Sequence, residues 1–229
     1  MNEVLVKVCG LTEVANALAC AGAGADWIGL NFHPASPRSI TVGRGAEIAS
    51  ALRGLAEPIG LFLDRPPGEV AEVAAQLGLR AVQLHGDESP EYLRELAGLL
   101  EGMDLKVVKA FRLGDAASVD RMVAYLGRAE DFGCPPDAVL VDAHVPGQAG
   151  GTGRSIPPEI LGRLPGHPRL ILAGGLDPAN VADRVASVRP WMVDVASGVE
   201  SSPGMKDLDR VVAFVAAARG GLTRTYASD

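Results

Sequence analysis

Hydrophobic and polar positions divide the chain into two kinds of segment that alternate from end to end. Short apolar runs rich in β-branched residues are typical of strands buried on both faces of a parallel sheet. We predict eight strands: Val4–Cys9, Trp27–Phe32, Ile59–Leu63, Ala81–Leu84, Lys106–Phe111, Ala138–Val141, Leu170–Leu172 and Met192–Val195. Alanine- and leucine-rich segments with helical spacing follow them: Glu13–Ala21, Arg44–Leu55, Gly68–Leu77, Pro90–Leu100, Ala116–Leu126, Pro158–Leu164, Asn180–Val188 and Leu208–Ala218.

This alternation predicts parallel strands joined by right-handed helical crossovers. Eight units of about 29 residues suit a (β/α)₈ barrel, which typically has about 250 residues. An open doubly wound sheet is the main competitor, but the first strand is not followed by G-x-G-x-x-G and the chain contains no G-x-x-x-x-G-K-[ST]. Prolines between the units indicate loops and not a linker. We therefore predict an α/β protein with one domain, a (β/α)₈ TIM barrel over residues 1–229.

Two of the predicted helices begin with recognisable capping chemistry. Thr12 precedes the acidic Glu13, and Ser89 precedes Pro90 and Glu91. A hydroxyl side chain before the first turn accepts an amide N–H, and proline suits the first helical position. Thr12 and Ser89 are therefore predicted N-caps.

Composition narrows the class of function. The formal charge is −7 and the pI is about 5.1, which argues against a protein that binds nucleic acid or anionic membranes mainly by charge. The chain has neither an apolar leader at its start nor a long apolar span. We expect a cytoplasmic protein with neither a nucleic-acid nor a membrane partner. Cys9, Cys20 and Cys134 have no spacing that indicates zinc or a disulfide framework, so no metal is predicted.

Active sites of (β/α)₈ barrels lie at the carboxyl ends of the strands. Polar or conformationally free residues stand at or just after these ends in every unit of the predicted barrel. They are Cys9, Asn31, His33, Asp64, Gln83, His85, Arg112, Asp142, Gly174, Gly175, Ser197 and Gly198.

Cys9 and Asp142 are the strongest candidates for chemistry. A free cysteine is often only a small buried hydrophobe, but Cys9 lies at the predicted barrel mouth, where a thiol can act as base or nucleophile. Asp142 ends an apolar run, where a carboxylate is costly unless it is hydrogen-bonded or functional. A structural role for Asp142, bonded to a loop amide, stays open. Asp64 ranks lower because Arg65 follows it as an obvious ion-pair partner.

Two glycine-rich turns, "LAGGLDPANV" and "VASGVESSPGMKD", follow the last two strands. Barrels often bind phosphate there through backbone N–H groups, although tight turns without a ligand remain an alternative. "HPASPRSI" places Arg38 in a proline-braced loop after the second strand. A guanidinium matches a carboxylate with two parallel hydrogen bonds, but a lone loop arginine is usually just solvated.

Taken in order, "VKVCGLT", "GADWIGLNFHPASPRSI", "AVQLHGDE", "VLVDAHVPGQAGGTG", "LAGGLDPANV" and "VDVASGVESSPGMKD" resemble the phosphoribosylanthranilate isomerase family of tryptophan biosynthesis. The resemblance runs from Lys7 to about Asp207 and implies a (β/α)₈ barrel without a cofactor. It also implies an Amadori rearrangement of N-(5-phosphoribosyl)anthranilate to 1-(2-carboxyphenylamino)-1-deoxyribulose 5-phosphate. By motif, Cys9 would be the general base and Asp142 the general acid.

The same resemblance suggests binding residues for a small phosphosugar. Arg38 would pair with the anthranilate carboxylate or otherwise orient that end of the substrate, His85 would stand in the pocket wall, and Asp194 would form hydrogen bonds. The phosphate would rest on amides of four residues, Gly174, Gly175, Ser197 and Gly198, with Gly151 and Gly153 closing over it. Two departures from the family are the absence of an aromatic pair after G-G-T-G and Ala196 in place of a polar residue.

Two rival functions stay open on the sequence. Another phosphosugar barrel, such as an epimerase or synthase, would need metal ligands or a lysine near a strand end, for which only Lys7 and Lys109 qualify. A catalytically dead barrel would have lost the acid or the base, and both are present. Lys7 shares the facing of Cys9 and would lower the pKa of its thiol. We expect a monomer or a homodimer.

Overall fold

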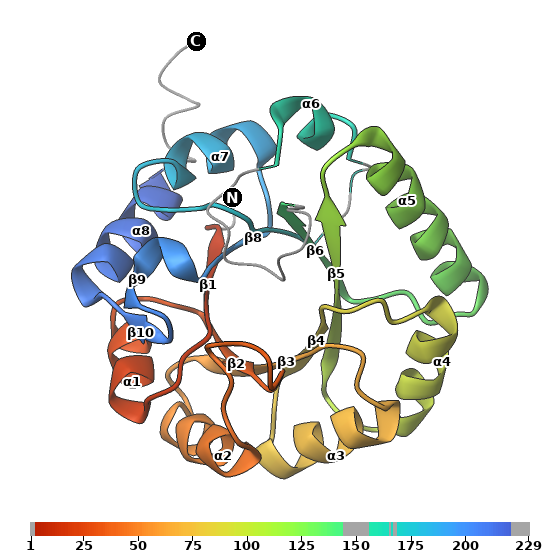
Figure 1. The fold of residues 1–229 in the computed structure, drawn as a ribbon, viewed down its shortest axis with the longest axis horizontal. Coiled ribbons are helices and arrows are strands. Elements are labelled where there is room, and N and C mark those ends of the chain that lie inside the picture. Colours follow the sequence, from red (N-terminus) through yellow and green to blue (C-terminus); the bar gives the residue numbers. More distant parts are fainter. Residues whose placement is uncertain (1–2, 144–155, 165, 167–168, 221–229) are drawn as a thin grey trace.

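The computed structural model describes residues 3–143, 156–164, 166 and 169–220. Eight parallel strands close into a barrel in chain order, and helices surround it (Figure 1). This confirms the predicted (β/α)₈ architecture. The barrel strands are β1 (Leu5–Cys9), β2 (Trp27–Asn31), β3 (Glu57–Phe62), β4 (Ala81–Leu84), β5 (Lys106–Leu113), β6 (Ala138–Ala143), β7 (Leu170–Leu172) and β8 (Met192–Val195).

The helices of the described residues follow the predicted segments, with differences at their ends. Helix α5 continues five residues beyond the predicted end at Leu126, and α6 ends three residues before Leu164. Their bounds are α1 (Val14–Gly22), α2 (Val42–Ala51), α3 (Pro67–Leu77), α4 (Pro90–Leu99), α5 (Ala116–Asp131), α6 (Pro158–Leu161), α7 (Val181–Val188) and α8 (Leu208–Gly220).

A small hairpin between β8 and α8 was not predicted. A single 3₁₀ turn, η1 (Ser197–Val199), leads into β9 (Glu200–Ser202), which pairs antiparallel with β10 (Met205–Lys206). The turn between the two strands holds Pro203 and Gly204, and Gly204 has a φ of +86°. Proline followed by glycine is a common turn signal, and glycine tolerates this left-handed backbone.

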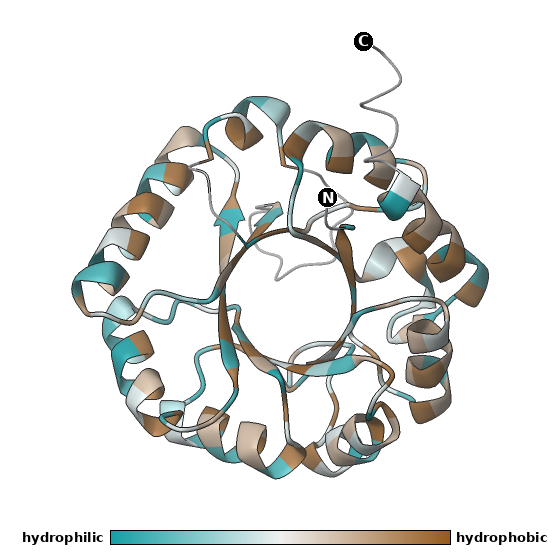
Figure 2. Cartoon of the chain, turned by 180° about the vertical axis from the view of Figure 1, so that it is seen from behind, coloured by the Kyte–Doolittle hydropathy of each residue, from teal (hydrophilic) through white to brown (hydrophobic). Residues whose placement is uncertain are grey.

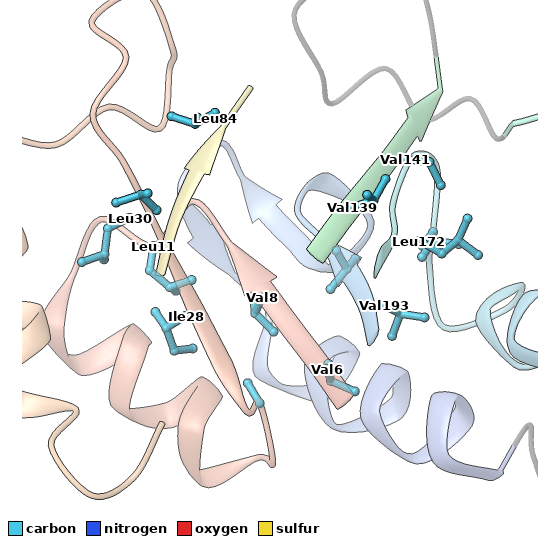
Figure 3. Packing of buried hydrophobic residues seen from close by; sticks show 14 of the residues in the cluster. Val6, Val8, Leu11, Ile28, Leu30, Leu84, Val139, Val141, Leu172 and Val193 are labelled. Carbon is cyan, nitrogen blue, oxygen red and sulfur yellow. The ribbon is translucent and has the colours of Figure 1, made fainter. Parts of the chain in front are cut away.

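Side chains alternate between two separate apolar layers, as the two-residue period of strands requires. In β1, Val6 and Val8 belong to the large cluster between strands and helices, which Figure 3 shows, whereas Leu5 packs inside the barrel. The strands are largely apolar with a few polar positions, and the helices carry both polar and apolar positions (Figure 2). Lys7 and Cys9 have the parity of Leu5 and therefore face the barrel interior.

The barrel interior is apolar toward the strand starts and polar toward the strand ends. At the strand starts, Trp27 and Trp191 meet edge to face, with ring centroids 5.5 Å apart. They pack in the inner cluster with buried residues such as Ile59 and Met192. Because large side chains fill the barrel interior at this end, the interior has room for a cavity at the opposite, carboxyl end.

Of the two predicted helix caps, one is confirmed and one is wrong. Ser89 caps α4, where its hydroxyl accepts the Tyr92 N–H at 3.3 Å. The residue at the N-cap of α1 is Glu13, with no side-chain cap bond, and the Thr12 hydroxyl donates instead to the Gly204 carbonyl at 3.0 Å. Thr12 thus ties the start of α1 to the unpredicted hairpin.

A buried ion pair between sheet and helices holds the loop that carries His85. Lys109 faces outward from β5, and its Nζ lies 2.8 Å from the Glu88 carboxylate and 2.8 Å from the Gly86 carbonyl. The other oxygen of Glu88 accepts the N–H groups of Asp64 and Gly86. Both side chains are at most 2% exposed, so each charge depends on the other.

Lys109→Met should destabilise the protein by about 3 kcal/mol, because it leaves the Glu88 charge buried without its counter-ion. The matched control is Arg44→Met, which removes one half of an exposed pair with Glu47 and should cost less than about 1 kcal/mol. Urea denaturation of both variants measures the two changes. Equal costs would show that the buried pair contributes no more than a surface one.

Candidate active site

A cavity of about 470 Å³ opens at the carboxyl ends of the strands. All nine residues that the sequence marks for catalysis or binding line it, although they come from six separate stretches of the chain. They are Cys9, Arg38, His85, Asp142, Gly174, Gly175, Asp194, Ser197 and Gly198. Asn31 and Gln83, near the ends of β2 and β4, and His33, just after β2, line the same cavity.

Cys9 ends β1 and is 7% exposed, beside the ion pair of Lys7 and Asp194. Both Asp194 oxygens lie 3.0 Å from the Lys7 Nζ, so the neighbouring lysine is already neutralised. Burial raises the pKa of the Cys9 thiol above its usual range, and the opposing effect of Lys7 does not cancel this. Lys7 thus acts to lower the pKa of the Cys9 thiol, as predicted, but the effect of burial is larger. Asp194, expected to contact substrate, has Lys7 as its partner.

Gly29 of β2 gives the Cys9 thiol its space. The two residues are register partners, and a Cβ on Gly29 would lie 2.6 Å from the Cys9 Sγ and 2.9 Å from its Cα. Any larger side chain there would overlap both. The glycine of "WIGLN" therefore keeps the thiol in place, a role that the sequence did not indicate.

Asp142 ends β6 and lies next to His85 of the β4–α4 loop. Its Oδ1 accepts the N–H of Ala143 at 2.7 Å, and its Oδ2 lies 3.7 Å from the His85 Nε2. The Gln83 amide nitrogen lies 2.9 Å from the His85 Nδ1. With the amide in this orientation Gln83 donates, so a neutral His85 carries its proton on Nε2, on the side of Asp142. His85 is thus a neighbour of the carboxyl group as well as part of the wall.

The glycine turns after β7 and β8 form one side of the cavity. Gly174 and Gly175 have φ values of +85° and +62°, which favour glycine. Within the described part of the chain, no acceptor takes the backbone N–H of either residue. A Cβ on Gly198 would lie 1.9 Å from the Leu176 carbonyl oxygen, so the two turns pack closely. Free amides on close-packed glycine turns suit an anion such as a phosphate.

Arg38 has a protein partner that the sequence did not predict. Its Nε and Nη2 each lie 2.7 Å from a different oxygen of Glu200 in β9. Lys206 of β10 donates to the same carboxylate at 2.7 Å and to the Ala196 carbonyl at 3.1 Å. One fork of the guanidinium is therefore occupied, and three N–H donors remain for a ligand.

Other strand-end residues lie elsewhere. Asp64 accepts the Asp87 N–H at 2.7 Å, and Arg65 pairs with Glu69, so the expected pair of Asp64 with Arg65 is wrong. The Arg112 Nη2 donates to the His85 carbonyl at 3.0 Å. Gly151 and Gly153, expected to close over a phosphate, lie outside the described residues.

A carboxyl group and a thiol that line one cavity at the mouth of a (β/α)₈ barrel are typical of an enzyme that moves protons on a small molecule. The family model described as N-(5'-phosphoribosyl)anthranilate (PRA) isomerase matches residues 6–217. The chain belongs to this family, and its activity is that isomerisation in tryptophan biosynthesis.

Relatives and solved structures agree with this. The N-(5'-phosphoribosyl)anthranilate isomerase of Geobacter sulfurreducens is 41% identical over 95% of this chain and 99% of its own. That of Rubrobacter xylanophilus is 42% identical over 93% and 98%. The Thermotoga maritima enzyme superposes with a TM-score of 0.81 at 32% identity, over 95% of this chain and 99% of that one.

Gly29→Ala should lower activity and stability together, because the new methyl group would overlap the Cys9 thiol and its backbone. We expect a cost of about 1–3 kcal/mol in the free energy of unfolding, with a fall in kcat. Gly98→Ala, at an exposed position of α4 with no atom within 4 Å, is the matched control and should leave activity unchanged. Chemical denaturation and steady-state kinetics measure both, and an unaltered kcat in Gly29→Ala would contradict the packing argument.

Proposed function

We propose that Cys9 and Asp142 are the base and the acid of this isomerisation. Asp142 donates a proton to the furanose ring oxygen while the C1′–O bond breaks, which leaves an iminium ion. Cys9 as thiolate then removes the C2′ proton, and the resulting enolamine tautomerises to the aminoketone. The observation that carries the assignment is that one cavity is lined by both groups, from β1 and β6, which stand three strands apart around the ring.

The rest of the cavity suits the two charged ends of the substrate. We assign the phosphate to the turns of Gly174, Gly175, Ser197 and Gly198, because their amides face the cavity and the first two have no acceptor among the described residues. A solved phosphoribosyl anthranilate isomerase is described in complex with reduced 1-(o-carboxyphenylamino)-1-deoxyribulose 5-phosphate, a ligand of this class. That structure has a TM-score of 0.77 at 32% identity. Arg38 would meet the carboxylate with its three remaining donors.

Charge pairing argues against the rival phosphosugar chemistry. A Schiff-base mechanism would need an unpaired lysine at a strand end. Lys7 is held by Asp194, and Lys109 is held by Glu88 on the outer side of the sheet. Neither lysine is free to react.

Location and assembly stay predictions for this chain. In the part of the chain that the structure describes, no helix has the length and hydrophobicity needed to cross a membrane. One solved relative is described as monomers generated by mutation from the dimeric Thermotoga maritima enzyme. We infer a cytoplasmic monomer or homodimer, and analytical ultracentrifugation distinguishes the two states.

Cys9→Ser and Asp142→Asn should each lower kcat by at least ~10²-fold, because each removes a positioned proton donor or acceptor. Loss of substrate fluorescence follows the reaction. Cys134→Ser, a partly exposed thiol away from the cavity, is the control and should keep wild-type kinetics. Wild-type rates in both active-site variants would end the assignment of acid and base.

The pH profile should reflect the raised pKa of Cys9. If the thiolate is the base, its fraction grows about tenfold for each pH unit below that pKa. Because burial raises the pKa of the thiol, kcat/KM should rise from about pH 7 and still be rising above about pH 9, where a thiol with the usual pKa of about 8.5 is already largely ionised. A profile that is flat through this range would exclude Cys9 as the titrating base.

A further inference from the structure

Glu200 and Lys206 belong to the motif "GVESSPGMKD", yet the acid–base mechanism uses neither. Lys206 is 3% exposed, and the Glu200 side chain is 6% exposed. Glu200 accepts four hydrogen bonds, two from Arg38, one from Lys206 and one from the Gly204 N–H at 3.1 Å. Only the Gly204 bond lies within the turn, and the other three bonds join the buried carboxylate to two cationic side chains.

The cluster lies against Cys9. The Arg38 side chain crosses Gly10, the residue after Cys9, so closely that a Cβ on Gly10 would lie 2.5 Å from the Arg38 Cδ. Lys206 donates to the carbonyl of Ala196, which lines the cavity together with Cys9. Lys206 and Arg38 both interact electrostatically with the thiol.

The charged side chains near Cys9 carry one more positive than negative charge. Lys7 and Asp194 cancel, whereas Arg38 and Lys206 share the single negative charge of Glu200. Three cations thus face two carboxylates, which leaves one positive charge beside the thiol. A Cys9 thiolate would make the group neutral.

The groups around Cys9 come from every element packed against it. They are Lys7 of β1, Asp194 of β8, Arg38 of the β2–α2 loop, Glu200 of β9 and Lys206 of β10, with His33, His85 and Asp142 on other parts of the cavity wall. Lys7 also interacts with the thiol and acts to lower its pKa, but Asp194 opposes it. The positive charge that is left over at the thiol therefore comes from Arg38 and Lys206, which share Glu200.

We propose that Glu200 and Lys206 are positioning residues that set the charge facing Cys9, with Lys206 as counter-ion of the thiolate and Glu200 as the group that limits the positive charge and orients Arg38. This proposal rests on the function proposed above for Cys9. It assigns to the β9–β10 hairpin a part in catalysis that involves no contact with the reacting atoms.

The two residues should act in opposite directions, which separates this role from simple folding support. Lys206→Met removes a cation and should slow alkylation of Cys9 about tenfold at a fixed pH below the thiol pKa. Glu200→Gln removes an anion and should speed it by a similar factor, while KM rises because Arg38 loses its charged partner. Burial acts to raise the pKa of Glu200, but hydrogen bonds from Arg38 and Lys206 lower it, so the carboxylate is charged in the wild type.

The experiment measures the rate of iodoacetamide labelling against pH in a Cys20→Ala, Cys134→Ser background, where Cys9 is the single thiol. Arg210→Met is the matched control: its Nη1 donates to the Glu200 backbone carbonyl at 3.1 Å, but its side chain is 56% exposed. It should move the labelling profile little, because solvent screens its charge. Near-ultraviolet circular dichroism shows that each variant is folded.

Opposite shifts for Lys206→Met and Glu200→Gln, together with a rise of KM in the latter, support the proposal. Shifts in the same direction, no shift in either, or a Lys206→Met profile equal to that of Arg210→Met would overturn it. If Lys206→Met does not fold, Glu200→Gln alone decides: faster labelling of Cys9 supports the proposal, and slower or unchanged labelling overturns it. The labelling rate depends on the state of the thiol and not on turnover. If Cys9→Ser kept wild-type activity, the assignment of Cys9 as base would be wrong, but the labelling result would still hold.

Discussion

Closure of the strands into a ring is the constraint on which everything else depends. In a closed parallel barrel every second side chain points inward, and the interior has room for only a few of them. Toward the starts of the strands this space is filled by Trp27, Ile59 and Met192, which belong to one buried cluster. Polar groups therefore gather at the opposite end, where the cavity opens.

Inside that end, charge balance constrains the chemistry. A fully buried lysine such as Lys7 is tolerated because Asp194 meets it with both oxygens. Asp194 also opposes the effect of Lys7 on the Cys9 thiol, because the lysine acts to lower the thiol pKa and the carboxylate acts to raise it. Arg38 and Lys206 share the single negative charge of Glu200, and Lys206 comes from a segment almost two hundred residues away from Cys9.

The outer layer supports the site through its loops. Lys109 and Glu88 lie between the sheet and the helices, and their hydrogen bonds hold the Gly86 backbone, next to His85. Arg112 donates to the His85 carbonyl from the neighbouring strand. His85 lies beside Asp142 on a loop that is tied from these two sides, so residues that do not line the cavity help to hold this pair of side chains in place.

The sequence by itself determined the architecture and the side chains that meet at the mouth, because both follow from local rules. Apolar runs with their period-two parity predicted the strands, and parallel strands bring most of their carboxyl-end residues to one cavity, although Asp64 and Arg112 do not line it. Pairing was different: Arg38 with Glu200, 162 positions apart, and Lys7 with Asp194, 187 apart, depend on how the ring closes. Local pattern suggested nearer partners, as with Asp64 and Arg65, and was wrong there. Only the tertiary structure decided which charges cancel, since a buried charge takes the partner that folding brings within reach.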